Sequence, residues 1–290
     1  MAGQGNSTAL EKDDSSPDNI EQKPHYRHGD YGGNPLAHIH SYTDSDSAST
    51  RLSAFGGAFQ PGLYKPPKRK FANPVPLGLS GFALTTFVLS MVNLGTRGLA
   101  TPNLVVGPAY AYGGLVQLLA GMWEIAIGNT FGGTALSSYG GFWISIGIIL
   151  TPGGFAIEDS YMNSGDFYAA FGLYLIGWFI FTFLLWMLTL KSTVMFNLLL
   201  LTVWITFLLL GISYMDAQNT AEGMPNEALT RGGGGTGIVA AFLAWYNMYA
   251  GIADDSNSLF IIPVIHFPWS ERGRQQRRAK KEGVSVEELA

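Results

Sequence analysis

The feature that most constrains this chain is a succession of six apolar segments separated by short polar connections. The segments are Leu77–Gly95, Pro108–Gly128, Thr134–Thr151, Phe167–Leu190, Val194–Tyr214 and Gly237–Ala253. Each is close to the ~20 residues that an α-helix needs to cross a bilayer, and the sixth is the shortest. Alternation of period two, which marks the strands of a membrane barrel, is absent from them. The sequence therefore predicts an all-α integral membrane protein with six transmembrane helices.

Composition favours a membrane protein over a soluble one. Of the 290 residues, 47% are hydrophobic and 13% are charged, against about 25% charged residues in a typical globular domain. A soluble helical bundle would need polar helix faces, and residues 167–190 do not offer one. The chain has no cysteine, so disulfides and thiolate metal sites are excluded. Because the first long apolar run begins near Leu77, that span would have to serve as its own signal.

The first 70 residues are rich in Ser, Asp, Gly, Pro, Asn and His, with little periodicity. This composition predicts a disordered cytoplasmic tail. Its histidines are His25, His28, His38 and His40. They suggest metal binding, but their spacing within a flexible segment favours a solvated tail, so we predict neither a metal site nor a cofactor. The expected organisation is a tail at 1–70, a membrane domain at 71–255 and a C-terminal tail at 256–290.

The basic residues predict how the chain is oriented in the membrane, because they are enriched on the cytoplasmic side. The basic run Lys65–Lys70 and the Arg/Lys-rich stretch 272–281 lie on the same side of an even number of spans, as does Lys191. The acidic connections at 158–166 and 216–227 fall on the other side. Both termini are therefore expected in the cytoplasm, and residues 270–290 are expected to form a short charged helix or tail.

Glu124 is the one carboxylate inside a predicted span, where an ionisable group is costly and is a functional candidate by default. Gln117 lies seven residues earlier, on roughly the same helix face. Asn129 and Thr130 continue the polarity at the end of the span. If Glu124 is buried, it could carry a proton together with an anion. The alternative is a structural or solvated carboxylate at interface depth.

The third segment opens with an unusual mixture of glycines, hydroxyl residues and aromatic rings between Phe131 and Trp143. The hydroxyl residues are Thr134, Ser137, Ser138 and Tyr139. Glycines in a membrane helix permit close approach of its neighbours, and buried hydroxyls need partners or a polar cavity. This stretch therefore predicts a closely packed helix that presents a polar stripe to a cavity.

No catalytic pattern emerges, and an enzyme is not expected. The single histidine after residue 40 is His266, which lies beyond the last span, so histidine-dependent nucleophilic or metal chemistry has no partners inside the spans. The stretch Arg231–Thr236 resembles a phosphate-binding loop but has no preceding strand and no following Gly-Lys-Ser/Thr. We expect it to be a flexible lead into the sixth span.

Several ordered motifs resemble one family. The run Asn73-Pro-Val-Pro-Leu-Gly-Leu-Ser-Gly-Phe82 resembles the N-P-A-P-L-G-L signature of the acetate/succinate permease family (AceTr, acetate uptake transporters). The motifs at 112–117, 121–124 and 128–131 look like that family's second span, and 134–143 looks like its third. The likeness covers about Ala72 to Ala253, and the long hydrophilic N-terminus resembles the fungal branch.

The resemblance implies a six-helix protomer that moves acetate and similar small monocarboxylates, sometimes succinate, across the plasma membrane. It also implies a homohexamer with one path per protomer. Family members narrow this path with a phenylalanine, a tyrosine and a leucine, and the first two match Phe82 and Tyr139. An ungapped alignment places the third at Val203, so this position departs from the family's leucine.

The residues agree with a path for a monocarboxylate, which needs a few donors and a small apolar pocket. The expected substrate-binding residues are Asn73, Gln117, Glu124, Asn129, Thr130, Ser138 and Tyr139. Transport could be proton-coupled or channel-like, and no nucleic-acid partner is expected. The alternative function is a membrane sensor or regulator of the acetate or ammonium response without significant flux.

Overall fold

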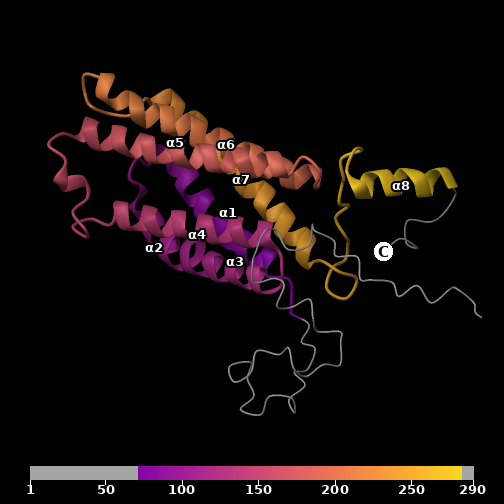
Figure 1. Ribbon diagram of the computed structural model, residues 1–290. Coiled ribbons are helices and arrows are strands. Elements are labelled where there is room, and N and C mark those ends of the chain that lie inside the picture. The colour runs from indigo at the N-terminus through magenta and orange to yellow at the C-terminus, as the bar shows by residue number, and fades with distance from the viewer. Residues whose placement is uncertain (1–70, 283–290) are drawn as a thin grey trace, which may run out of the picture. The chain divides into compact units, whose positions relative to one another are not determined.

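The computed structural model describes residues 71–282, and within this range all regular secondary structure is helical (Figure 1). An isolated bridge between Thr193 and His266 is the one strand-like contact in the same range. The tail predicted at residues 1–70 lies outside the described residues, as do residues 283–290. The prediction of an all-helical chain is confirmed for the described part.

Five helices are long. They are α1 (Val75–Asn93), α4 (Thr130–Leu150), α5 (Ser164–Leu188), α6 (Val194–Met215) and α7 (Glu227–Ile252). Between α1 and α4 the chain is helical from Pro102 to Ala126, in the order η4 (Pro102–Val105), α2 (Val106–Tyr110), the π-helical η5 (Ala111–Val116) and α3 (Gln117–Ala126). Short 3₁₀ turns and a basic helix make up the rest of the regular structure in residues 71–282: η3 (Thr96–Gly98), η6 (Glu158–Ser160), η7 (Asp216–Asn219) and α8 (Glu271–Glu282).

The long helices begin where the sequence supplies a capping side chain. The side chains of Asn129, Asn163, Thr193 and Asn226 accept backbone N–H groups in the first turns of α4, α5, α6 and α7. These N–H groups have no partner within the helix, so the caps satisfy them at the ends of the spans. The helix α1 instead begins with Pro74 and Pro76, at positions where no N–H is needed.

Within the part of the chain that the structure describes, five segments are long and apolar enough to cross a membrane. They are Val75–Asn93, Pro102–Ala126, Thr130–Leu150, Ser164–Leu188 and Val194–Asn219. The predicted sixth span corresponds to α7, which has 26 residues but is not apolar enough by the same measure. Its first turns hold Glu227, Arg231 and four consecutive glycines, which lower its apolarity.

The structure corrects several predicted boundaries and the role of one glycine run. The second segment begins at Pro102 rather than Pro108, and α4 begins at Thr130 rather than Thr134. Residues 231–236 are not a flexible lead into the sixth span. They form the second and third turns of α7, which starts at Glu227. A Cβ at Gly234 would lie 2.6 Å from the Leu94 nitrogen, and one at Gly233 would lie 2.6 Å from a Leu210 methyl carbon. These glycines are therefore a packing surface, which brings α7 close to α1 and α6.

The helices pack in a defined order. The helix α1 lies against α7, α7 against α6, and α6 against α5, while α3 packs on α4 and α1 also contacts the segment from η5 to α3. Figure 1 shows α5, α6 and α7 as one group of long helices beside α1 and α4. A buried apolar cluster links these helices and includes Phe82 of α1, Tyr139 of α4 and Val203 of α6. This cluster is where the candidate site lies.

Candidate functional site

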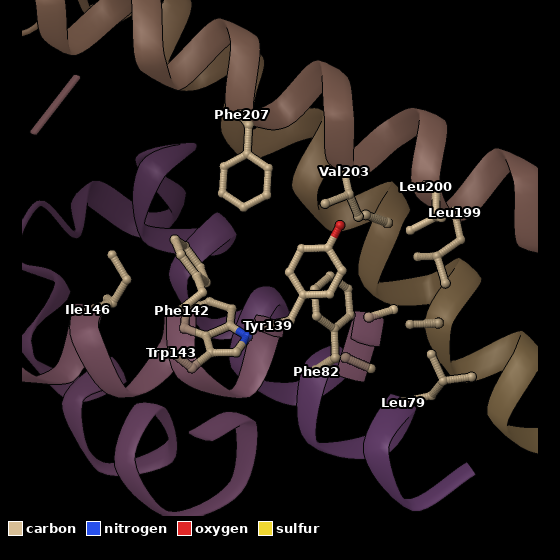
Figure 2. Close-up of a cluster of buried hydrophobic side chains, with 14 of the residues drawn as sticks. Leu79, Phe82, Tyr139, Phe142, Trp143, Ile146, Leu199, Leu200, Val203 and Phe207 are labelled. Atoms are coloured by element: carbon tan, nitrogen blue, oxygen red, sulfur yellow. The ribbon is translucent and has the colours of Figure 1, made fainter. Parts of the chain in front are cut away.

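Three residues that the sequence predicted to form a constriction meet in the core. Phe82, Tyr139 and Val203 are 6%, 4% and 4% exposed, and they belong to one apolar cluster. Figure 2 shows the three side chains pointing toward one another from α1, α4 and α6. The ring centroids of Phe82 and Tyr139 are 5.8 Å apart, with an interplanar angle of 54°. We refer to Phe82, Tyr139 and Val203 as the throat.

A hydrogen bond fixes the position of the Tyr139 ring. Its hydroxyl donates to the Thr182 side-chain oxygen on α5 at 2.9 Å, and Thr182 is fully buried. Trp178 of α5 packs against the same ring, with centroids 6.0 Å apart. The phenol is therefore held by α5, while its ring packs against Phe82 in the throat. Its hydroxyl has a protein partner, so Tyr139 contributes shape more than a free donor.

A cavity of about 40 Å³ adjoins the throat, which is room for about three water molecules or one solute of similar size. It lies among α1, α4, α6 and α7. Its lining residues are Phe82, Thr86, Leu89, Ser90, Asn93, Phe142, Trp143, Val203, Thr206, Phe207, Leu210 and Ala240. Two throat residues, Phe82 and Val203, are thus part of the wall. None of these lining residues carries a charge.

The polar stripe expected on α4 is not part of the wall of this cavity, and the prediction of a stripe that faces a cavity stays a prediction. Thr134, Ser137, Ser138 and Tyr139 are all absent from its wall, which receives Phe142 and Trp143 from α4 instead. The reason is helix rotation. Ser137 faces α3, where a Cβ at Gly121 would lie 2.3 Å from its hydroxyl oxygen.

Most of the polar side of the cavity comes from α1, with Thr206 added by α6, and the sequence analysis did not identify it. Thr86, Ser90 and Asn93 reach the cavity together with Phe82. Their spacing of four, four and three residues places all four on one helix face. This spacing could have been found in the sequence, but nothing in it says which face of α1 borders a cavity.

A second polar group forms where α3 ends and α4 begins. Glu124 is 1% exposed, and one of its carboxylate oxygens accepts a hydrogen bond from the Asn129 side-chain amide. The Asn129 side-chain oxygen in turn accepts the Gly132 N–H of α4 at 2.9 Å. The carboxylate also lies close to the backbone N–H of Val75, at the start of α1. Glu124 is therefore buried, and the alternative of a solvated carboxylate does not fit its position.

Gln117 lies deeper on the same helix. It is fully buried, and neither its amide nitrogen nor its amide oxygen has a hydrogen-bond partner among the described residues. The hydroxyl of Ser137 and the second oxygen of Glu124 are also buried without a partner there. Gly121 lies between Gln117 and Glu124 on α3 and faces Ser137. Buried polar atoms without protein partners point to water or solute along this face.

The remaining predicted binding residues lie nearer the surface. Asn73 is exposed, and its side-chain oxygen accepts the Val75 N–H at 3.1 Å. Thr130 is exposed at the start of α4, and Ser138 is half-buried. The structure therefore brings Asn73, Glu124 and Asn129 to one end of α1, whereas the side chains of Thr130 and Ser138 make no hydrogen bond to a throat residue.

The site elements follow one another along α1. Val75 lies beside Glu124, Phe82 lies two turns further in the throat, and Thr86 to Asn93 border the cavity. A polar end with a buried carboxylate, a pair of buried aromatic rings and an uncharged cavity thus follow one another along α1. This order suits the passage of a small solute with one polar and one apolar end.

Comparison with known proteins agrees with this description. A family model described as the GPR1/FUN34/yaaH family matches residues 55–269. The chain is 57% identical over 261 residues to acetate permease A of Emericella nidulans, covering 88% of this chain and 85% of that protein. It is 30% identical over 195 residues to the succinate-acetate/proton symporter SatP of Escherichia coli, covering 67% of this chain and 96% of that one. Among solved structures, the bacterial acetate channel SatP matches with a TM-score of 0.57 and 29% identity, over 67% of this chain and 99% of that chain.

Proposed function

This chain belongs to the GPR1/FUN34/yaaH family, and from that membership together with the site geometry we propose that it transports acetate and related small monocarboxylates across a membrane. The observation that carries the proposal is the throat, in which two aromatic rings 5.8 Å apart lie next to an uncharged cavity. A passage of this kind admits a solute with a short alkyl end and disfavours multiply charged ions.

The path runs through each protomer, from the Glu124 end of α1 through the throat to the cavity. Glu124 is the proton partner in a coupled version of this transport. Its burial and the two groups that face it, the Asn129 amide and the Val75 N–H, support that role. Gln117 and Asn73 provide polar contacts on the same side of the throat, and Thr130 and Ser138 provide more distant ones.

Six spans place both termini on the cytoplasmic side of the plasma membrane, with α7 as the sixth. Its buried face of Gly233, Gly234, Gly237 and Ala240 supports this placement, because a helix that packs this closely needs little apolarity of its own. The N-terminal segment 1–70 and the C-terminal segment 256–290 both lie on the cytoplasmic side. The protein is not an enzyme.

The protomers assemble as homohexamers. Exposed apolar side chains on α3 and α5 support a face that is covered by lipid or by another copy of the chain. Leu119 and Trp123 on α3 are 50% and 52% exposed, and Leu173 and Leu184 on α5 are 61% and 57% exposed. Faces this apolar are stable in a bilayer but not in water.

A truncation tests transport against signalling. Cells that express residues 65–290 should take up labelled acetate at a rate per molecule close to that of cells with the full chain, because the throat and the cavity lie within residues 71–282. A protein that only reports acetate status would show no expression-dependent uptake in either form. That result would contradict the proposed function.

A further inference from the structure

Two buried donors border the cavity without any partner. The hydroxyl oxygen of Thr86 and the indole nitrogen of Trp143 are both buried, and neither makes a hydrogen bond to a described residue. The residues themselves are 8% and 2% exposed, and both line the cavity. Figure 2 shows the Trp143 indole nitrogen at the edge of the ring that faces Tyr139. Because an unmade buried hydrogen bond is costly, two such donors on one cavity indicate a ligand that accepts from them.

The neighbouring Thr85 shows that the free hydroxyl of Thr86 is not a general property of this helix. Thr85 is also buried, but its hydroxyl donates to the Gly81 carbonyl at 2.8 Å. Threonine in a helix usually makes this contact to the preceding turn. Thr86 makes none, so its hydroxyl remains available on the face that borders the cavity.

The rest of the wall defines what the ligand would be. Around the two donors lie the side chains of Phe82, Phe142, Val203 and Phe207. No lining residue is charged, so a second carboxylate or a phosphate would be buried without a counter-ion. The cavity volume of about 40 Å³ limits the ligand to a few heavy atoms.

We propose that the cavity is a binding site for a small monocarboxylate, in which the Thr86 hydroxyl and the Trp143 indole N–H donate hydrogen bonds to one carboxyl group. The short alkyl end packs against Phe82 and Phe207. Ser90, Asn93 and Thr206 form the polar side of the wall, where the ligand exchanges with water. This assignment rests on the proposed transport function and adds the residues that hold the substrate beyond the throat.

Matched substitutions test the assignment, measured as acetate uptake into proteoliposomes that contain the full chain. Thr86→Val keeps the shape and removes the donor, and Thr85→Val is its control on the same helix turn. We expect Thr86→Val to raise the KM for acetate about three- to tenfold, the usual effect of one lost hydrogen bond. Thr85→Val should leave the KM within about twofold, since only a contact to the backbone is lost.

Trp143→Phe is the second test, with Trp204→Phe as its control. The Trp204 nitrogen is also buried without a partner, but its ring stacks on Trp186 at 5.6 Å between α5 and α6 and does not line the cavity. Trp143→Phe should raise the KM, and Trp204→Phe should not. Equal KM values in each matched pair would overturn the assignment.

A binding measurement separates this site from transport itself. Saturating acetate should raise the midpoint of thermal unfolding of the detergent-purified protein, because a ligand that binds the folded state stabilises it. The acetate concentration that gives half of the maximal shift should rise about three- to tenfold in Thr86→Val and should rise likewise in Trp143→Phe, but should not change in Thr85→Val and Trp204→Phe. A shift of this kind without uptake would refute the proposed transport and keep the site. Uptake without any difference between the paired variants would refute the site and keep the transport.

Discussion

The rings of Phe82 on α1 and Tyr139 on α4 lie 5.8 Å apart and are tilted by 54° to each other. They come from helices that are distant in sequence, and both are almost completely buried. The Tyr139 hydroxyl is held by Thr182, so the tilt of the pair is set by α5 as well. The arrangement of the two rings is therefore a property of three helices rather than of one side chain.

Removing either ring should widen the throat. We expect Phe82→Ala and Tyr139→Ala each to raise the ratio of lactate to acetate uptake several-fold, because the lost ring volume admits a larger solute. Phe87→Ala is the control, since Phe87 lies on α1 but packs against Phe242 and Trp245 away from the cavity. Size selectivity that stays unchanged in both throat variants would place the constriction elsewhere.

The helices could be predicted from the sequence because apolar runs of membrane length are local signals. Their starts were placed less well, at Thr134 and Gly237, whereas α4 and α7 begin directly after the capping residues Asn129 and Asn226. The run Arg231–Thr236 was misjudged, because four consecutive glycines suggest a loop unless the neighbouring helices are known. In the folded chain they pack against α1 and α6, and the tight contacts offset their poor helix propensity.

The site was predictable only in part. Phe82, Tyr139 and Val203 came from a family resemblance, and the structure brings them together. Glu124 and Gln117 stood out because polar residues inside an apolar span are rare. Thr86 and Trp143 did not, since threonine and tryptophan are common in membrane helices. Their importance depends on the rotation of α1 and α4, which only the packing of four helices defines.

Glu124 should govern any coupling to protons. Glu124→Gln preserves the shape and an acceptor for Asn129 but cannot take up a proton, so an inward proton gradient should no longer stimulate acetate uptake. Glu227→Gln is the control, because Glu227 is exposed on α7 and pairs with Arg231 at 2.7 Å. If the Glu124 variant kept the pH dependence of the unmodified protein, this role would have to be abandoned.

Gly132 should be essential for the Glu124–Asn129 contact. A Cβ at this position would lie 2.5 Å from the Asn129 amide nitrogen and 2.7 Å from a Glu124 oxygen. We expect Gly132→Ala to destabilise the protein by about 1–3 kcal/mol, as overpacking usually does. Gly141 is on the same helix and has open space around it, so Gly141→Ala should be neutral or slightly stabilising. Thermal unfolding in detergent checks both, and equal midpoints would contradict this packing argument.

His266 should make the attachment of the C-terminal segment sensitive to pH. Burial, and then the nearby charge of Arg272, lower the pKa of His266 below its usual value of 6.5. Between the lowered pKa of His266 in the attached segment and its usual value of 6.5 in the detached segment, His266 is more often protonated in the detached state. The attachment therefore becomes more stable as the pH rises through this interval. The attachment is fully stable above about pH 6.5 and weakens as the pH falls toward the lowered pKa.

The amide of Val194 reports on this attachment, because it donates to the Ile265 carbonyl at 2.9 Å. Its protection against hydrogen–deuterium exchange, corrected for the intrinsic rate, should fall as the pH is lowered from 7.5 to 5. His266→Gln should remove most of this dependence. Protection that does not change with pH in the unmodified protein would show that His266 has no such effect.

Acetate uptake into proteoliposomes that hold the purified full chain tests the central claim most directly, with and without an inward proton gradient. We expect uptake in both conditions relative to protein-free liposomes, and accumulation above equilibrium when the gradient is present. If acetate equilibrated across the membrane without accumulating, the protein would be a channel, in which the throat alone sets the selectivity among solutes. No uptake by protein that is folded in the liposomes would contradict the account.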